Sequence, residues 1–347
     1  MRRSTVKKHQ GFSLPEILIS VFIIGLISVI ASSGMAMNGS IFNATYNQTQ
    51  NINNQGITKA FMLWSKSDST LGTLPTPYTG GSYYSSIVNT GSAATVDVDL
   101  MTYIQQQGIG LTEANDDNFA SHRIRVFQKV SGLTKQMPLY VLSGPLVTLT
   151  YDFGVVYQTA CRLTDSSCNT SSVHGSSATL TSSNYTSWTT SGTDFGAAYV
   201  STLPLHEAML NVTIYRLQTI RSKLLDAFNI QKLGVAPGDT TDWFVAPNGT
   251  GATNLSGASA TTNQGCYDGW YSLNSGTVNV LSQLGLGQSE YGVTAWGGVI
   301  QYCRDYDPTY AGVLVQPHYA ALRINQSVST AASPDTSIIG NNVFITF

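Results

Sequence analysis

A long apolar run near the N-terminus is the strongest hydrophobic pattern in the chain. Residues 14–37 are apolar or small except for Glu16, and no charged side chain occurs between Glu16 and Lys59. About 20 apolar residues match the hydrocarbon thickness of a bilayer, so the run predicts a membrane-spanning helix. Four basic residues precede it and place the N-terminus in the cytoplasm and the rest outside: Arg2, Arg3, Lys7 and Lys8.

A stripe of side chains at intervals of three and four predicts that this helix continues to about Ser65. The stripe would lie against a globular head, and a helix over residues 12–65 would be roughly 80 Å long at 1.5 Å per residue. Residues 38–55 are rich in Asn and Thr, which are poor helix formers, so this half could instead be irregular or partly unwound. The members of the stripe are Phe42, Tyr46, Thr49, Asn53, Ile57, Phe61 and Trp64.

The later part of the chain predicts a second helix and several antiparallel strands. The helix covers Leu205–Leu233 and ends at Gly234. Its apolar face comprises Leu210, Ile214, Leu217, Leu224 and Phe228. Strand patterns occupy His122–Val130, two or three segments of Pro138–Leu163, Tyr319–Gln326 and Val343–Phe347. A long N-terminal helix with an antiparallel-sheet head is an α+β fold.

Three other segments show little periodicity. Residues 67–118 are rich in Ser, Thr, Gly and Tyr and predict loops with short strands. The Ser/Thr/Gly tract Thr164–Ser201 predicts an exposed excursion. From Asp242 onward the pattern indicates turns and short strands. We therefore expect large irregular insertions in the head.

Composition indicates an exported protein. Charged residues make up 10% of the chain, against roughly 25% in an ordinary soluble domain. Hydrophobic residues reach 42%, so the chain can fold, but its surface must rely on neutral polar groups. Beyond the basic residues at the N-terminus the balance is acidic, which argues against general nucleic-acid binding.

The four cysteines all follow the apolar run. An even number in an exported domain predicts two disulfides, with three possible connectivities. The alternative is that the thiols are free and buried. We expect one bond to join Cys161 to Cys168 and the other to join Cys266 to Cys303, closing the C-terminal region 266–303.

The residues Gly11–Glu16 (GFSLPE) resemble the processing site of type IV prepilins and type II secretion pseudopilins. The resemblance implies that a prepilin peptidase cuts between Gly11 and Phe12 and methylates the new N-terminal residue. It divides the chain into a cleaved leader (1–11), a long helix (12–65, with 12–37 in the membrane or filament core) and a globular extracytoplasmic head (66–347). In this family the helix packs on the antiparallel sheet of the head.

Two other interpretations of the N-terminus fit less well. A secretory signal peptide would have a shorter apolar core, although Ala31-Ser32-Ser33 could mimic its cleavage site. A plain membrane anchor leaves Glu16 unexplained, because a carboxylate in a spanning helix costs a few kcal/mol. The chain departs from the family in lacking a proline about 22 residues after the cut. Pro15, before Glu16, is more familiar from minor pilins and minor pseudopilins.

Glu16 has a role under this resemblance. An ionised carboxylate buried in a filament core needs a partner, and the free α-amine of Phe12 on a neighbouring subunit can supply it. The pair would set the axial register of the filament. The simpler alternative is an acidic residue favoured by the first turn of a helix.

A second passage, Thr294–Cys303, is similar to the Asp-Pro-Trp-Gly…Tyr segment of the pilin sheet, although the Asp-Pro pair is missing. Taken alone, Trp296 before two glycines predicts a ring packed over a turn, with Val299–Tyr302 entering a strand. The resemblance covers residues 12–65 firmly and 266–326 loosely.

No catalytic constellation is recognisable, and we expect neither an enzyme nor a cofactor. His206-Glu207 lacks a second histidine at the zinc-protease spacing. Asp305 and Asp307 are weak calcium candidates, and a solvated turn is the favoured interpretation. The basic side chains of the second helix do not form one stripe, so no specific nucleic-acid partner is predicted.

The predicted function is a structural subunit of a type IV pilus, used for adhesion, motility or DNA uptake. Its expected partners are itself as a homopolymer, other pilins, prepilin peptidase and the inner-membrane assembly platform. It would lie in the inner membrane before assembly and in an extracellular filament afterwards. The alternatives are a pseudopilin of type II secretion and a membrane-anchored surface binding module that does not polymerise.

Overall fold

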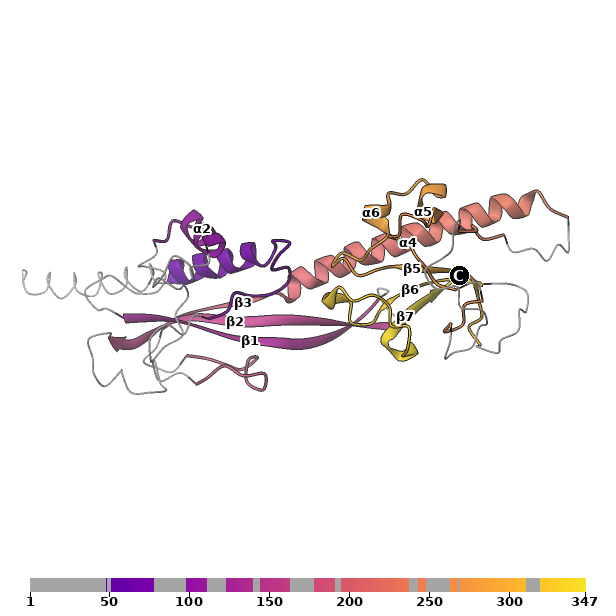
Figure 1. Ribbon diagram of the computed structural model, residues 1–347. Coiled ribbons are helices and arrows are strands. Elements are labelled where there is room, and N and C mark those ends of the chain that lie inside the picture. The colour runs from indigo at the N-terminus through magenta and orange to yellow at the C-terminus, as the bar shows by residue number, and fades with distance from the viewer. Residues whose placement is uncertain are drawn as a thin grey trace, which may run out of the picture.

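The computed structural model describes residue 48 and residues 51–77, 98–110, 123–139, 144–162, 178–190, 195–236, 243–247, 263–267, 269–309 and 319–347. Its elements form an elongated arrangement, with α2 near one end and the C-terminal sheet near the other (Figure 1). Helix and antiparallel sheet are both present, so the α+β class is confirmed. The described residues contain a helix over residues 51–64, and the prediction for residues 12–47 lies outside them.

The first sheet has three antiparallel strands in the order β1-β2-β3. They are β1 (Arg123–Pro138), β2 (Leu146–Arg162) and β3 (Phe195–Ser201). β1 and β2 pair from Arg123 opposite Arg162 to Pro138 opposite Leu146, with a register shift between Val130 and Leu133. The prediction of two or three strands in Pro138–Leu163 was wrong, because β2 runs through that segment as one strand.

Each face of this sheet is covered by a different part of the chain. On one face, the helix over residues 51–64 and helix α2 (Val98–Gln106) enclose Phe127, Val156 and Val200. On the other face, Leu180 and Trp188 pack against Val126, Val155 and Tyr157. The expectation of loops and short strands for residues 67–118 was therefore wrong at α2. The prediction of an exposed segment at Thr164–Ser201 was wrong for Leu180, Trp188 and β3. Leu180 and Trp188 pack on an apolar face of the sheet, and β3 is one of its strands.

Helix α4 (Leu203–Leu233) follows β3 almost directly and extends toward the far end of the molecule (Figure 1). Proline occupies its first turn, where a backbone N–H would have no helical partner. At the other end, the backbone N–H of Gly234 bonds to the carbonyl of Gln231, so the predicted C-terminal stop is confirmed. Leu210, Leu217 and Leu224 of the predicted apolar face are buried.

The second sheet has the antiparallel order β4-β5-β6-β7. Its strands are β4 (Tyr271–Ser272), β5 (Gln301–Tyr306), β6 (Tyr319–Asn325) and β7 (Asn342–Thr346). The two C-terminal strands agree with the sequence prediction. The short helices are α5 (Val280–Gln283), α6 (Gln288–Tyr291), η2 (Val328–Thr330) and η3 (Ile339–Asn341).

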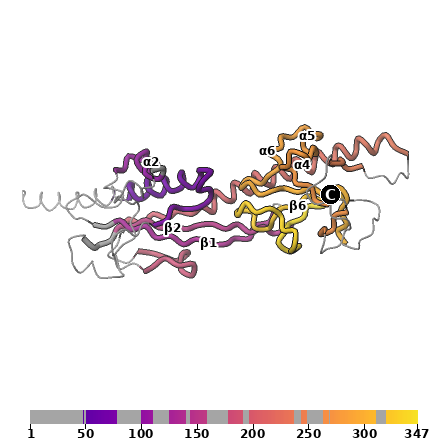
Figure 2. The backbone as a smooth tube through the Cα atoms, in the orientation of Figure 1, coloured from indigo at the N-terminus to yellow at the C-terminus, as the bar shows by residue number. Residues whose placement is uncertain are grey.

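One core joins the two sheets. Val147 and Leu149 of β2 share it with Leu217 of α4 and with Leu322 of β6. The backbone N–H of Thr148 also donates to the carbonyl of Gln326. In Figure 2, β1 and β2 accordingly run from α2 toward β6. Among the described helices, none combines the length and the apolar character that crossing a bilayer requires.

Candidate functional site

The predicted processing and assembly residues Gly11, Phe12 and Glu16 lie outside the described residues. What the structure does describe is how the end of the N-terminal helix is fixed to the head. We call the segment of residues 65–74, together with its partners Lys129, Asp152 and His206, the junction.

The helix over residues 51–64 buries one face on the first sheet. Ile57 and Phe61, two members of the predicted stripe, are fully buried, whereas Asn53 and Trp64 are half-buried. The rings of Phe61 and Phe127 lie 4.5 Å apart between centroids. Burying these two apolar side chains contributes several kcal/mol to holding the helix on the sheet, at about 1.5–3 kcal/mol each.

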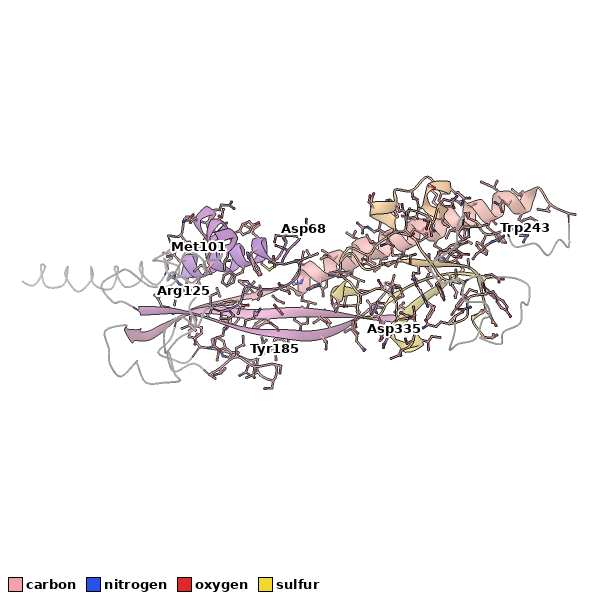
Figure 3. All side chains as sticks on the ribbon, in the orientation of Figure 1. Asp68, Met101, Arg125, Tyr185, Trp243 and Asp335 are labelled. Carbon is pink, nitrogen blue, oxygen red and sulfur yellow. A yellow bond between two sulfur atoms is a disulfide. The ribbon has the colours of Figure 1, made fainter. Side chains whose placement is uncertain are left out.

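Asn54 adds a polar bridge on the same face. Its Oδ1 accepts a 2.8 Å hydrogen bond from Nε of Arg125, and its amide nitrogen donates to the carbonyl of Gly196. Asn54 is fully buried, and Arg125 is 1% exposed although its side chain is long and charged. Arg125 lies between the helix and the sheet in Figure 3. The bridge thus links the helix to both β1 and the start of β3.

After Ser65 the chain turns sharply, and the backbone of Leu74 is then clipped to the sheet. Its N–H donates to Oδ2 of Asp152 at 2.9 Å, and its carbonyl accepts from Nζ of Lys129 at 2.9 Å. The same lysine and aspartate form an ion pair of 3.4 Å. Both charged side chains are largely buried. The ion pair balances their charges, and their hydrogen bonds to Leu74 satisfy its backbone N–H and carbonyl.

Asp152 also ties this clip to the start of α4. Its backbone N–H donates to Oγ1 of Thr202 at 2.9 Å, and its carbonyl accepts from the N–H of Thr202 at 3.0 Å. Thr202 is the residue before α4 and is fully buried. One residue of β2 therefore connects the chain after the N-terminal helix to the head's own long helix.

His206 completes the junction from the first turn of α4. One ring nitrogen, Nε2, is 3.0 Å from the carbonyl of Gly72, and the other, Nδ1, accepts a 3.0 Å hydrogen bond from Nε1 of Trp296. The two rings are stacked, with centroids 6.0 Å apart. Burial lowers the pKa of His206 below its usual value, against smaller opposite effects of the Gly72 hydrogen bond and the charge of Asp152.

The Trp296 turn is held against α4 by further hydrogen bonds. Arg216 donates to the carbonyls of Val293 and Thr294 at 3.0 Å, and Thr213 accepts from the N–H of Ala295. Trp296 is buried at a turn and the chain enters β5 at Gln301, and the ring packs against His206 of α4. Trp296 thus connects the junction to the second sheet.

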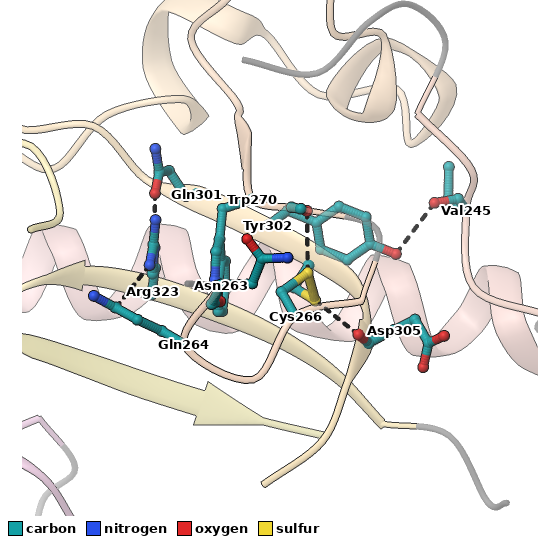
Figure 4. The surroundings of a disulfide bond; sticks show 11 residues. Val245, Asn263, Gln264, Cys266, Trp270, Gln301, Tyr302, Asp305 and Arg323 are labelled. Atoms are coloured by element: carbon teal, nitrogen blue, oxygen red, sulfur yellow. Dashed lines mark hydrogen bonds between the residues drawn. A yellow bond between two sulfur atoms is a disulfide. The ribbon is translucent and has the colours of Figure 1, made fainter. Parts of the chain in front are cut away.

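Cys266 and Cys303 form a disulfide, which is the pairing expected from the sequence. The bond attaches the segment before β4 to the outer face of the second sheet (Figure 4). Trp270 and Tyr306 pack beside it in a small separate core. The other expected bond, between Cys161 and Cys168, lies outside the residues whose side chains are described.

A buried arginine stands beside this disulfide. Arg323 donates from Nε to Gln301 at 2.7 Å and from Nη1 to Gln264 at 2.8 Å (Figure 4). Its guanidinium carbon lies 4.3 Å from the centre of the Trp270 ring, a cation–π arrangement. Burial lowers the pKa of Arg323 to about 9. The ion pairs found between described residues do not include it.

The two weak calcium candidates lie at the end of β5. Oδ1 of Asp307 accepts hydrogen bonds from the N–H and the hydroxyl of Thr309, which is an Asx turn. The backbone of Asp305 accepts from the N–H of Tyr267, and the residue is mostly buried. No group of three or more His, Cys, Asp or Glu side chains among the described residues is placed to hold a metal ion.

Sequence reasoning missed most of the junction. It rejected His206 as a zinc-protease ligand, and it did not consider Lys129 or Asp152 as members of a buried contact. A local signal existed only at Asp152, which stands between Tyr151 and Phe153, because Lys129 lies in a segment where polar and apolar residues alternate. The contacts themselves join residues up to 134 positions apart, which no local pattern specifies.

The comparisons with known proteins bear on the N-terminus. A family model described as "Prokaryotic N-terminal methylation motif" matches residues 6–32. Neither the search of curated proteins nor the search of solved structures gave a match to the chain. The matched residues include Gly11, Phe12 and Glu16, the positions that the sequence singled out. The chain therefore carries, at residues 6–32, the prokaryotic N-terminal methylation signal, consistent with a type IV pilin or pseudopilin.

Proposed function

We propose that the chain is a structural, non-catalytic subunit of a type IV pilus, polymerising through its N-terminal helix into an extracellular filament. The observation that carries the proposal is the methylation motif at residues 6–32. Prepilin peptidase would cut between Gly11 and Phe12 and methylate Phe12, leaving the apolar run on the mature subunit. The subunit would wait in the inner membrane, meet the assembly platform there, and then join other copies and other pilins.

Features of the head support a filament exposed outside the cell. Only 10% of residues are charged, and Ser, Thr, Asn and Tyr are abundant in the chain. The helix over residues 51–64 is attached by a buried face, a buried Asn–Arg bridge and the clip on Leu74. A head fixed in this way moves with its helix, so tension on the filament would be carried into the sheet. Adhesion, motility and DNA uptake are all compatible uses.

Processing is tested by N-terminal sequencing of the mature protein. We expect the mature chain to begin at Phe12 with a methylated amine, because only glycine at position 11 lets the peptidase hold the backbone closely. A mature chain that begins at Met1 or Ala31 contradicts the proposal. Gly11→Val should block cleavage, whereas Ser13→Ala, on the other side of the cut, should not.

Assembly is tested at Glu16. In a filament core the carboxylate would offset the amine of a neighbouring Phe12, and its loss would leave that amine buried alone, at about 3–5 kcal/mol per contact. Glu16→Ala should abolish filaments while export and cleavage continue, and Ser20→Ala in the same apolar run is the control. The measurement compares the membrane and sheared-filament fractions. A normal filament yield from Glu16→Ala refutes this role.

A pseudopilin of type II secretion is the second candidate, because the methylation motif is shared by both kinds of subunit. Electron microscopy of sheared surface filaments, with mass spectrometry of their subunits, separates the candidates. Long surface filaments that contain this chain support the pilus. Accumulation in the envelope with a secretion defect on deletion supports the pseudopilin. If neither wild type nor variants polymerise and the protein still acts at the surface, the membrane-anchored binding module is correct.

A further inference from the structure

His206 lies where three separate parts of the chain meet. It belongs to the first turn of α4, it touches the carbonyl of Gly72 in the segment after the N-terminal helix, and it touches the indole of Trp296 before β5. The side chain is 2% exposed. Because no other described side chain contacts both segments by hydrogen bonds, the ring alone couples them to α4 in this way.

The two hydrogen bonds define the protonation state of the ring. The indole N–H of Trp296 can only donate, so Nδ1 of His206 must be the acceptor and carry no proton. The carbonyl of Gly72 can only accept, so Nε2 must carry the proton. The ring is therefore neutral and held in a single tautomer. A second proton on Nδ1 would place two N–H groups against each other.

The surroundings leave little room for the ring to move. Gly72 has a φ of +78°, and a Cβ built there would lie 2.2 Å from Cε1 of His206. On the other side, the Trp296 turn is fixed to α4 through Arg216 and Thr213. A protonated ring could not rotate to a new acceptor without displacing one of these segments.

The charged groups around His206 are few. Asp152 on β2 is the anion that favours the imidazolium, but it is already paired with Lys129 on β1. Glu207 is adjacent on α4 and pairs with Lys135 at the surface. Arg216 follows further along α4, while Lys66 and Asp68 in the segment after the helix are exposed. The described Trp296 turn, residues 294–298, carries no charge.

We propose that His206 is an acid-sensitive latch, in which protonation of Nδ1 breaks the Trp296 hydrogen bond and loosens the Trp296 turn, residues 294–298, from α4. The latch is a property of the folded head and does not depend on polymerisation. Its partner is the proton, and its output is the freedom of the Trp296 turn to move relative to α4.

The direction follows from linkage. Burial lowers the pKa of His206 in the closed latch, whereas an open latch returns the imidazole to about 6.5. Below pH 6.5 the open form therefore binds more protons, and acid favours opening. The opening equilibrium should rise by up to about tenfold for each pH unit until the closed form also becomes protonated. Carboxyl groups of model peptides titrate near pH 4, so a window above pH 5 isolates the histidine.

Hydrogen exchange of the full chain in detergent micelles tests the latch. The amides of Ala295 and Gly297 are hydrogen-bonded to Thr213 and to the carbonyl of Thr294, so their peptide reports opening directly. After correction for the intrinsic rate, exchange in this peptide should rise up to about fivefold between pH 6.5 and 5.5, because half of the open form is already protonated at pH 6.5. The peptide covering β6 should not change. No change at residues 294–298, or an equal change in β6, overturns the proposal.

Two variants assign the effect to the ring. His206→Gln keeps an acceptor and a donor on one planar group but cannot be protonated, so the dependence on pH should disappear. His174→Gln, at a histidine elsewhere in the chain, should keep it. If His206→Gln does not fold, Trp296→Phe removes the donor to Nδ1, and exchange at residues 294–298 should then be fast already at pH 7.5. Retained pH dependence in His206→Gln, or normal protection in Trp296→Phe, refutes the latch.

Discussion

Two buried cations, one in each half of the molecule, are held in different ways. In the helix-bearing half (residues 51–77, 98–110 and the first sheet), Lys129 is paired with Asp152 across the backbone of Leu74. In the disulfide half (residues 263–309 and the second sheet, within the described ranges), Arg323 is bonded to two neutral amides and lies over Trp270. The described disulfide, Cys266–Cys303, stands beside the second of these groups.

The difference determines what can open each half. The attachment of residues 65–74 rests on an ion pair, a neutral histidine and a glycine backbone. Protonation changes the charge of the ion pair or of the histidine, and an added methyl group at Gly72 would overlap the histidine ring. The disulfide half is closed by a bond that protons do not affect, and its buried cation has no carboxylate partner among the described ion pairs to lose. We therefore expect the molecule to yield first at the junction, where the N-terminal helix meets the head.

The largest expected effect is at Asp152. Asp152→Ala leaves Lys129 buried without its counter-ion and removes the acceptor of the Leu74 N–H, which should cost about 3–5 kcal/mol of unfolding free energy. Glu207→Ala is the control, because the Lys135–Glu207 pair is about 40% exposed and worth at most about 1 kcal/mol. Thermal unfolding in detergent measures both. Equal losses in the two variants would contradict a buried clip.

Removing the disulfide should cost slightly less. The bond closes a loop across 37 positions, so replacing Cys266 and Cys303 by alanine should lower stability by about 3–4 kcal/mol in the chain-entropy model. The effect should be local to the second sheet. Hydrogen exchange should therefore rise in β5 and β6 while residues 65–74 keep their protection. Early exchange at the junction in this double variant would show that the halves do not open separately.

Gly72→Ala tests the backbone at the junction. The position has a φ of +78°, which costs a side chain roughly 1–3 kcal/mol, and the added Cβ would overlap His206. Gly285→Ala is a matched control, since its φ is +70° and nothing lies within 4 Å of the added atom. The difference between the two losses isolates the contact with His206. If the two variants have the same unfolding midpoint, the contact is not tight.

Local sequence patterns predicted the elements whose first and last residues are determined by their neighbours in the sequence. Helix α4 begins within two residues of the predicted start and ends at the predicted residue, because an apolar face and a glycine stop define it. Strand β2 was divided in the prediction although it is continuous. Gly154 lies in its middle, and a Cβ there would be 2.8 Å from the ring of Phe127. The glycine makes room for a neighbouring side chain and does not end the strand.

The site could be predicted only in part. The processing signal is contiguous, so six residues and an apolar run were enough to identify it. The turn at Trp296 could be predicted from the two glycines that follow it. The junction depends on pairs such as Leu74 with Asp152 and His206 with Trp296, which lie 78 and 90 positions apart. Whether a polar residue within an apolar segment is buried or exposed depends on these distant partners, and the sequence alone does not supply them.

The smallest expected effect is at Arg323, and it separates the two kinds of buried cation. Arg323→Met removes the donors to Gln301 and Gln264 and the contact with Trp270. Gln264 keeps a second donor, the amide of Asn342, so mainly Gln301 loses a partner. Burial already disfavours the cation, as its lowered pKa indicates, so removing it recovers part of the loss.

We therefore expect Arg323→Met to cost about 1–2 kcal/mol, well below the cost of Asp152→Ala, because it leaves no opposite charge buried alone. Arg221→Met, at an exposed position of α4, should be close to neutral. Thermal unfolding of the three variants under one condition orders them. If Arg323→Met is as damaging as Asp152→Ala, then Arg323 holds a buried anion in place or organises the disulfide region. The contrast between a paired and an unpaired buried cation would then no longer explain why the junction opens first.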